Sequence, residues 1–260
     1  MIAYIKSKNL IGTDTLIPHN QNFAKAMYGF FELGVEVKLF EEWIEIANVI
    51  NDSDILVDYI DSVIYFLKKF NPNFTVFEDY PKELDEFYKR KIWKDTINHF
   101  SSDPNLFTKA YFIKPIKEKV FTGKVIYGIK DLVGCGNQYE DYEILVSESI
   151  NLIKEWRVFI LYDNIIGIKP YKGETYIDNT DIYEFLKQVL AKFRTIKDRP
   201  NACSIDIGIV EDDNNKCYPV IVETNDCIAL GSYGLDSLLY AKMTSARQSQ
   251  VLDRKDELKF

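Results

Sequence analysis

The sequence has 260 residues, of which 47% are hydrophobic and 14% aromatic. A chain of this length and composition can bury at least one large core, and more readily two packed subdomains, so intrinsic disorder is not expected. The formal net charge of -8 and the pI of about 5.0 provide no overall attraction for a phosphate backbone. We therefore do not expect nucleic acid to be the principal partner.

No stretch of the sequence approaches the roughly 20 consecutive apolar residues that a membrane-spanning helix needs. The N-terminus leads directly into a polar segment, without the apolar core of a signal peptide. We expect a soluble, cytoplasmic protein with no membrane partner. The cysteines form no C-x-x-C pair and histidine is scarce, which argues against a zinc site and against histidine-based nucleophilic catalysis.

The first part of the chain, up to about residue 75, alternates short β-rich runs with helical patterns, which is typical of a small parallel α/β layer. Gly34 stands where a helix C-cap is needed before the second strand. The pattern predicts strands at 2–5, 35–39 and 55–57, and helices at 23–33 and 41–49.

The next segment predicts a short strand at 74–77 and, after Pro81, an amphipathic helix at about 84–100. The loop residues 101–105 then end the first domain. We therefore predict an α/β domain at 1–100 and a second, strand-rich domain at 101–260.

The second domain is predicted to be strand-rich, with hairpin turns between successive strands. One helix is expected within it, at about 181–193, capped by Asn179 or Thr180. The predicted strands lie at 110–114, 124–129, 143–146, 156–161, 165–169, 204–210 and 218–223.

The strongest chemical signal lies in the last predicted hairpin. If its turn is centred on Asn214-Asn215, strand alternation places Asp206 directly opposite Glu223 and on the same face as Asn225. Like charges across a sheet are destabilising, whereas a hard divalent cation prefers carboxylate and amide oxygens. The hairpin therefore predicts a magnesium site. The alternative is a surface hairpin whose acidic side chains face water.

Two lysine-containing segments are candidates for binding an anion. Lys114 ends an apolar strand and is followed by a proline, and an inward-facing lysine needs an anion. Five residues later, Lys119 and Lys124 flank a turn at Gly123 that is suited to lie over phosphates. The alternative for each segment is that its lysines are solvated surface groups.

Two further segments contain candidate nucleotide contacts. Strand alternation places Glu155 and Arg157 on one face, where Arg157 could clamp a phosphate with two hydrogen bonds or, alternatively, form a cross-strand salt bridge. Upstream, the apolar segment 144–150 is interrupted by Ser147 and Glu148, and its backbone is suited to framing an adenine.

Together these motifs resemble the ATP-grasp superfamily, and more narrowly its clade named for one arginine and two lysines. The resemblance extends over about residues 85–240 and implies two α+β lobes that grip ATP, preceded by a parallel α/β pre-ATP-grasp domain. The segments that carry the resemblance are 90–93, 112–115, 119–123, 155–157, 223–226 and 231–234.

The resemblance also implies roles for individual residues. Asp206, Glu223 and Asn225 would hold Mg²⁺, and Arg157 would face the transferred phosphoryl group as a catalytic residue. The residues that would contact ATP are Arg90, Lys114, Lys119 (also catalytic), Gly123, Ser147, Glu148, Glu155 and Arg157. Many ATP-grasp enzymes have a longer glycine-rich phosphate loop, of which only Gly123 is present here.

The implied activity is an ADP-forming carboxylate–amine ligase. It would transfer the γ-phosphoryl group to a small-molecule or peptide carboxylate, and an amine or other nucleophile would attack the resulting acyl phosphate. Such a reaction requires positioned groups and charge neutralisation rather than a histidine triad. The alternatives are a phosphotransferase of the same fold, which stops after phosphoryl transfer, and a non-catalytic nucleotide-gated binding module.

Overall fold

The computed structural model describes residues 1–116, 120–136, 140–172, 180–212 and 214–260. The chain forms two compact units, which we call unit 1 (1–87, 153–209 and 218–260) and unit 2 (88–152 and 210–217). These compact units have other boundaries than the predicted domains 1–100 and 101–260. The two-domain division remains a prediction.

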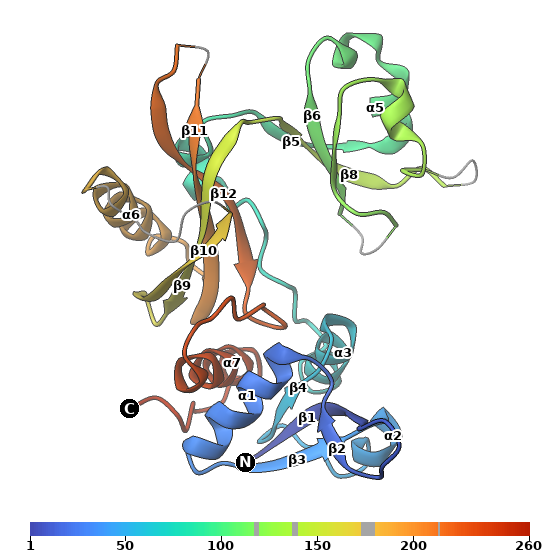
Figure 1. Ribbon diagram of the computed structural model, residues 1–260, viewed down its shortest axis with the longest axis vertical. Helices are drawn as coiled ribbons and strands as arrows, with labels where there is room; N and C mark the ends of the chain where they lie inside the picture. The colour runs from blue at the N-terminus through green and yellow to red at the C-terminus, as the bar shows by residue number, and fades with distance from the viewer. Residues whose placement is uncertain (117–119, 137–139, 173–179, 213) are drawn as a thin grey trace. The chain divides into compact units, whose positions relative to one another are not determined.

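The N-terminal part of unit 1 is a parallel α/β layer, as predicted (Figure 1). Its central strand, β1, pairs in parallel with β3 and β4 and antiparallel with β2. Gly34 has φ of 74°, which favours glycine and ends the first helix as expected. The elements are β1 (Ile2–Asn9), β2 (Leu16–Pro18), α1 (Gln21–Glu32), β3 (Glu36–Phe40), α2 (Trp43–Ile46), β4 (Ile55–Val57) and α3 (Ile60–Phe70).

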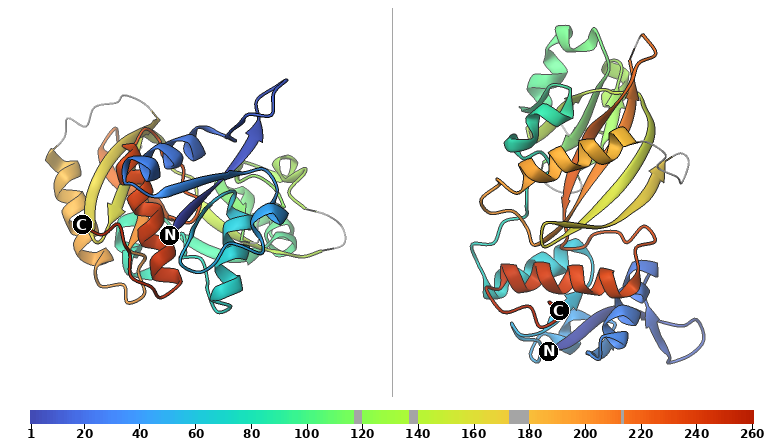
Figure 2. Two further views of the ribbon diagram at one scale, coloured as in Figure 1. Left: turned by 90° about the horizontal axis from the view of Figure 1, so that it is seen from below. Right: turned by 90° about the vertical axis from the view of Figure 1, so that its left-hand side faces the viewer.

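A second four-stranded sheet, in the order β10-β9-β11-β12, supplies the site described below. Helix α6 lies across one face of this sheet (Figure 2) and buries an apolar stripe that includes Phe185, Val189 and Phe193. The elements are β9 (Leu152–Leu161), β10 (Asn164–Lys172), α6 (Thr180–Phe193), β11 (Ala202–Glu211) and β12 (Cys217–Asp226).

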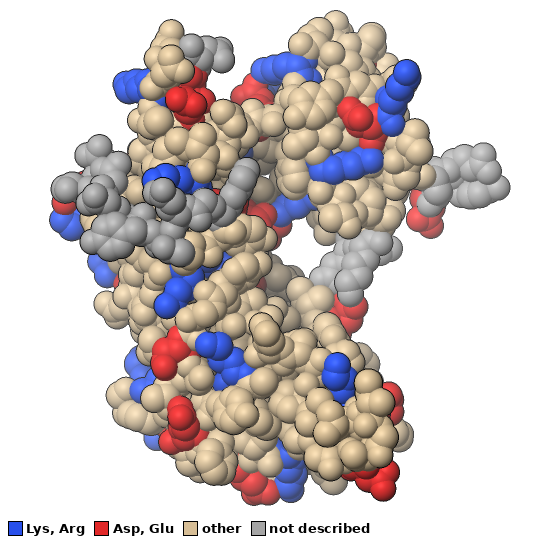
Figure 3. Space-filling view, in the orientation of Figure 1, with Lys and Arg blue, Asp and Glu red and all other residues tan. Residues whose placement is uncertain are grey.

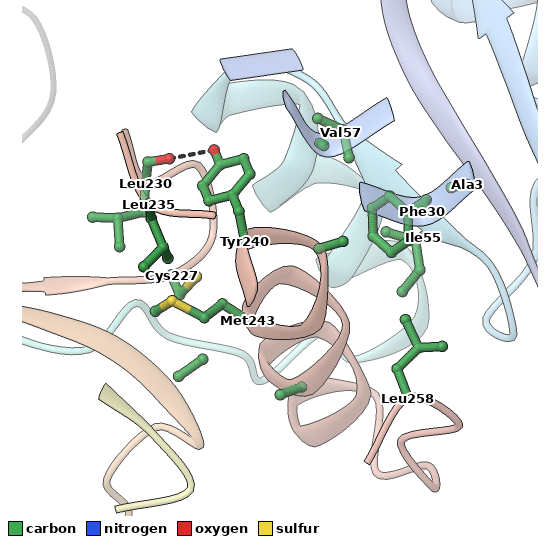
Figure 4. Packing of buried hydrophobic residues seen from close by; sticks show 14 of the residues in the cluster. Ala3, Phe30, Ile55, Val57, Cys227, Leu230, Leu235, Tyr240, Met243 and Leu258 are labelled. Atoms are coloured by element: carbon green, nitrogen blue, oxygen red, sulfur yellow. Dashed lines mark hydrogen bonds between the residues drawn. The ribbon is translucent and has the colours of Figure 1, made fainter. Parts of the chain in front are cut away.

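Helix α7 (Ser237–Val251) packs against both sheets of unit 1 and is buried on nearly all sides, beside α1 (Figure 2). Its Tyr240 hydroxyl donates to the carbonyl of Leu230 (Figure 4). Its Gln248 side chain pairs with both backbone groups of Leu56, at 3.0 Å from Leu56 N and 2.7 Å from Leu56 O. The amide of Gln248 therefore supplies the hydrogen bonds that a neighbouring strand would supply to Leu56 at the edge of β4.

Unit 2 is built on an antiparallel sheet in the order β5-β8-β6-β7. Its core contains Phe100, Ile113 and Val146. The elements are β5 (Ile92–Thr96), α5 (Ile97–Ser102), the 3-10 helix η2 (Pro104–Phe107), β6 (Tyr111–Pro115), β7 (Lys124–Ile126), the 3-10 helix η3 (Ile129–Leu132) and β8 (Glu143–Glu148).

The predicted helix at 84–100 is wrong. The chain instead forms η1 (Lys82–Leu84), α4 (Asp85–Tyr88), β5 and the start of α5. Lys89 has φ of 53°, a left-handed conformation that ends α4, and residues 92–96 then pair with β8. Pairing with a strand far along the chain has overridden the local helical pattern.

Two smaller predictions also need correction. The expected strand at 74–77 is absent, and Phe77 N donates to the side chain of Asp226 instead of to a strand. The strand expected at 124–129 ends at Ile126, and η3 begins at Ile129.

Lys and Arg occur together with Asp and Glu over the face of the molecule in Figure 3. Within the described ranges, no helix is both long enough and apolar enough to cross a membrane.

Candidate functional site

The centre of the site in unit 1 is an ion pair between two neighbouring strands. Arg157 of β9 donates to Asp206 of β11 through two parallel hydrogen bonds, Nε to Oδ1 at 2.8 Å and Nη2 to Oδ2 at 2.6 Å. Both side chains are buried, at 7% and 3% exposure. The salt bridge that the sequence left as the alternative for Arg157 is therefore formed in this structure.

The neighbouring strand β12 adds the other two predicted metal ligands. Asn225 Nδ2 donates to Asp206 Oδ2 at 3.1 Å. The negative charge of Glu223 raises the pKa of Asp206, so the two carboxylates are close enough to interact. The structure thus brings Asp206, Glu223 and Asn225 together, with Arg157 as an additional cation.

The pKa values of the ion pair reflect opposing effects. Burial raises the pKa of Asp206, and the hydrogen bonds and charge of Arg157 only partly oppose this rise. Burial lowers the pKa of Arg157, but its hydrogen bond and attraction to Asp206 outweigh burial and leave that pKa raised. Arg157 therefore remains a cation throughout the physiological range.

Two tyrosines enclose the guanidinium of Arg157. Its Cζ lies 4.5 Å from the ring centre of Tyr233 and 5.6 Å from that of Tyr171, and the rings stack on each other at 4.8 Å. A hydrogen bond with Tyr233, followed by burial, raises the pKa of Tyr171 to about 12. Tyr171 and Tyr233 are 47% and 42% exposed, so they form an aromatic surface beside the ion pair.

The loop that carries Tyr233 depends on glycine. A Cβ on Gly231 would lie 2.7 Å from Cε2 of Tyr233, so the ring folds back over Gly231. Tyr233 itself has φ of 42°. Between them, Ser232 donates from N and Oγ to Asn22 Oδ1, at 3.0 and 2.8 Å. These contacts fix Tyr233 against Arg157.

The side chains of Asp206, Glu223 and Asn225 fit a hard divalent cation in kind, and the spacing of Asp206 and Asn225 suits one. Mg²⁺ binds oxygen at about 2.0–2.1 Å in octahedral geometry, so adjacent ligand atoms lie about 2.9 Å apart. Asn225 Nδ2 and Asp206 Oδ2 are 3.1 Å apart, and a half-turn of the amide exchanges Nδ2 for the carbonyl oxygen. Among the described residues, no group of three or more His, Cys, Asp or Glu forms a potential metal site, so the set relies on the amide of Asn225.

Several of the predicted nucleotide contacts lie together in unit 2. Arg90 Nε donates to Ser147 Oγ at 2.8 Å. Glu148 accepts hydrogen bonds from Lys109 and from the backbone N of Lys91, and these bonds lower its pKa. A cavity of about 490 Å³ is lined by residues that include Arg90, Glu148, Ser149, Ile150 and Tyr127.

The remaining predicted residues have different positions. Lys114 is half-buried in β6, and a Cβ on Gly123 would lie 3.2 Å from Cβ of Lys114 and 2.7 Å from the ring of Phe112. Close packing therefore favours glycine at position 123 whether or not this residue covers a phosphate. Glu155 belongs to β9 of unit 1, near Tyr171. Lys119, the other predicted catalytic residue, lies outside the described residues.

Two neighbours of the predicted site residues were not found from the sequence. Tyr171 lies near the end of β10 without any distinguishing sequence pattern, and Lys109 precedes β6 as an ordinary surface lysine. The flanking glycines of Tyr233 were a usable signal, because a tyrosine between Gly231 and Gly234 indicates a constrained loop.

Comparison with solved structures shows the ATP-grasp fold. D-alanine–D-alanine ligase from Bacillus anthracis, complexed with ATP, matches with a TM-score of 0.58 at 12% identity, over 97% of this chain and 98% of that one. An ATP-grasp RimK domain protein from Sphaerobacter thermophilus gives 0.54 at 9%, over 97% and 98%. L-amino acid ligase from Bacillus licheniformis gives 0.58 at 10%, over 100% and 75%.

The family comparison is more specific. The family described as an ATP-grasp domain, the second family of the clade named for one arginine and two lysines, matches residues 87–243, more than half of the chain. The chain therefore belongs to this family, and the resemblance inferred from the motifs is confirmed. No curated protein sequence matches the chain.

Proposed function

We propose that this protein is an ATP- and Mg²⁺-dependent, ADP-forming ligase. It phosphorylates a carboxylate of a small molecule or peptide, and an amine or other nucleophile attacks the acyl phosphate. The observation that carries the proposal is the buried pair of Arg157 and Asp206, with Asn225 hydrogen-bonded to Asp206 and Glu223 beside it, in a chain of the ATP-grasp family. The ligases with the same fold support the reaction class by analogy.

The metal-binding face has a defined part in this proposal. Asp206, Glu223 and Asn225 would hold Mg²⁺, which when bound would neutralise charge on the phosphates. Arg157 orients a phosphoryl oxygen through its planar fork of N–H donors and stabilises the charge that develops there. Tyr171 and Tyr233 restrict the orientation of Arg157 and exclude water from one side of it.

Most of the nucleotide contacts are proposed for unit 2. Arg90 and Lys114, with the glycine turn at Gly123, bind phosphate, while Ser147 and Glu148 present the segment that frames the adenine. The cavity beside Arg90 and Glu148 offers about 490 Å³ for this purpose. Lys119 and Glu155 complete the proposed set.

A thermal-shift series tests nucleotide binding. A ligand that binds only the folded protein stabilises it by about 2.7 kcal/mol at a concentration of 100 Kd. We expect ATP with Mg²⁺ to raise the melting temperature by about 5 °C or more under these conditions. GTP with Mg²⁺ and ATP with EDTA serve as controls. An unchanged melting temperature with saturating ATP and Mg²⁺ would contradict the assignment.

ADP release in the presence of pooled carboxylates and amines then tests the reaction. A ligase requires both pools and gives a coupled product by mass spectrometry. ADP with a stable phosphorylated product, independent of the amine pool, identifies a phosphotransferase. ATP binding without turnover over the whole panel identifies a nucleotide-gated binding module.

A further inference from the structure

We propose that Arg157 and a divalent cation compete for the carboxylate of Asp206. In the metal-free protein the guanidinium of Arg157 pairs with this carboxylate, and a bound divalent cation displaces it. This inference rests on the metal site of the proposed function and goes beyond it. It assigns Arg157 a second role, that of a competitor for the metal, and makes its release toward a phosphoryl oxygen depend on metal binding.

The contacts of Asp206 commit both of its oxygens to other groups. Arg157 donates one hydrogen bond to each oxygen, in the bidentate geometry that best fits a carboxylate. Asn225 adds a third bond on Oδ2, and it presents its NH₂ group rather than its carbonyl oxygen. The side chains are therefore arranged to satisfy a carboxylate, and a metal requires them to rearrange.

The charges make simultaneous occupancy unfavourable. A guanidinium and a divalent cation that share one carboxylate would lie within a few ångströms of each other. Asp206 and Arg157 are 3% and 7% exposed, so little water is present to screen that repulsion. Replacement of the monovalent group by the divalent ion is therefore favoured over binding of both.

The surroundings of Arg157 provide a place for the displaced guanidinium. The ring of Tyr233 already lies 4.5 Å from Cζ, and the ring of Tyr171 lies 5.6 Å from it. Cation–π contact with these rings persists when the bonds to Asp206 are lost. Within the described ranges, Nη1 of Arg157 has no hydrogen-bond acceptor, so the fork already has a donor available for a phosphoryl oxygen.

Manganese binding without nucleotide tests the competition directly. Mn²⁺ serves as the probe, and free Mn²⁺ is measured by electron paramagnetic resonance against wild-type protein and Arg157→Met. A neighbouring arginine lowers the proton affinity of an aspartate by about one to three orders of magnitude. The affinity of the same carboxylate for a divalent cation should be lowered by at least as much. We expect Arg157→Met to bind Mn²⁺ about tenfold or more tightly than wild type. Equal or weaker binding overturns the proposal, because Arg157 would then only orient Asp206.

Metal rescue of stability gives a second, independent measurement. Arg157→Met leaves a buried carboxylate without its cation, so its melting temperature should fall, and Mn²⁺ should restore it by more than it raises that of wild type. Arg247→Met is the matched control, because Arg247 and Asp226 form a bidentate pair of the same burial in unit 1. Rescue of both variants to the same extent contradicts a specific competition at Asp206.

Two further variants keep the outcomes distinct. Arg157→Lys replaces Arg157→Met in the test if the methionine variant does not fold. An ammonium group cannot form the bidentate pair with Asp206, so the Mn²⁺ affinity of Arg157→Lys should also be higher than that of wild type. Asp206→Asn should abolish Mn²⁺ binding. If wild type binds Mn²⁺ and neither Arg157 variant binds it more tightly, the competition is wrong while the metal site stands. If no variant with Asp206 intact binds Mn²⁺, the metal site of the proposed function is wrong as well.

Discussion

Unit 1 contains two buried arginine–aspartate pairs that are nearly identical in geometry and different in surroundings. Arg157 and Asp206 are joined at 2.8 and 2.6 Å and are 7% and 3% exposed. Arg247 and Asp226 are joined at 2.6 and 2.7 Å and are 8% and 2% exposed. Distance and burial alone would assign them the same role.

Their other contacts separate the two pairs. Asp226 also accepts from Phe77 N, and Arg247 also donates to Gln250, so backbone and side-chain groups of the fold complete this pair. It ties α7 to the end of β12. Around Arg157 and Asp206 the additional groups are Asn225, the carboxylate of Glu223 and two half-exposed tyrosine rings. A buried ion pair is thus a candidate functional site when further candidate ligands surround it, and a structural contact when backbone and side-chain groups of the fold complete its hydrogen bonds.

The largest expected effect is on the structural pair. Arg247→Met removes one partner and leaves Asp226 as a buried, uncompensated charge, which costs about 3–5 kcal/mol of unfolding free energy. Urea denaturation followed by circular dichroism measures the loss. Arg199→Met, in the partly exposed bidentate pair with Asp163, should cost about 1 kcal/mol or less and is the control. Equal costs for the two variants would contradict the structural role of Arg247.

The next effect is on turnover at the pair of Arg157 and Asp206. Asp206→Asn removes the carboxylate that we propose holds the metal and should lower the rate of ADP formation by about 10²–10³-fold, similar to the loss of one group that stabilises transition-state charge. Its stability should also fall, because buried Arg157 loses its charged partner. Asp226→Asn should reduce stability without a comparable loss of rate in the folded fraction. Steady-state kinetics at a temperature where both variants are folded distinguishes them, and full activity in Asp206→Asn would remove Asp206 from the site.

The smallest effect concerns the partly exposed pair of Asp163 and Arg199. The hydrogen bond from Arg199 lowers the pKa of Asp163 below its usual value of 3.8. The folded pKa is depressed, so the stabilisation is fully present above about pH 4 and is lost as the pH falls through the lower folded pKa. We expect about 0.2–1 kcal/mol for this exposed pair. Urea denaturation between pH 2 and 6 should show this loss in wild type and not in Asp163→Asn, and identical pH profiles would contradict it.

Local sequence patterns determined most of the strands and the membership of the candidate metal site. Alternation of polar and apolar residues is set by the backbone pleat, so it correctly indicated strands at β9, β11 and β12. The same rule predicted that Asp206, Glu223 and Asn225 would gather, because residues two apart on a strand share a face. The order of the motifs indicated the ATP-grasp family, which the family comparison confirms.

The tertiary structure alone decided the features that depend on distant partners. Helix α7 has no apolar stripe to reveal it, because its polar residues are buried against backbone and side-chain groups elsewhere in unit 1, as Gln248 is against Leu56. The segment at 92–96 became a strand because β8 offers it hydrogen bonds. The pairing of Arg157 with Asp206 joins residues 49 positions apart. The strand pleat and the residue propensities act over a few neighbouring residues. The pairing of buried charges is instead decided by the packing of the whole chain.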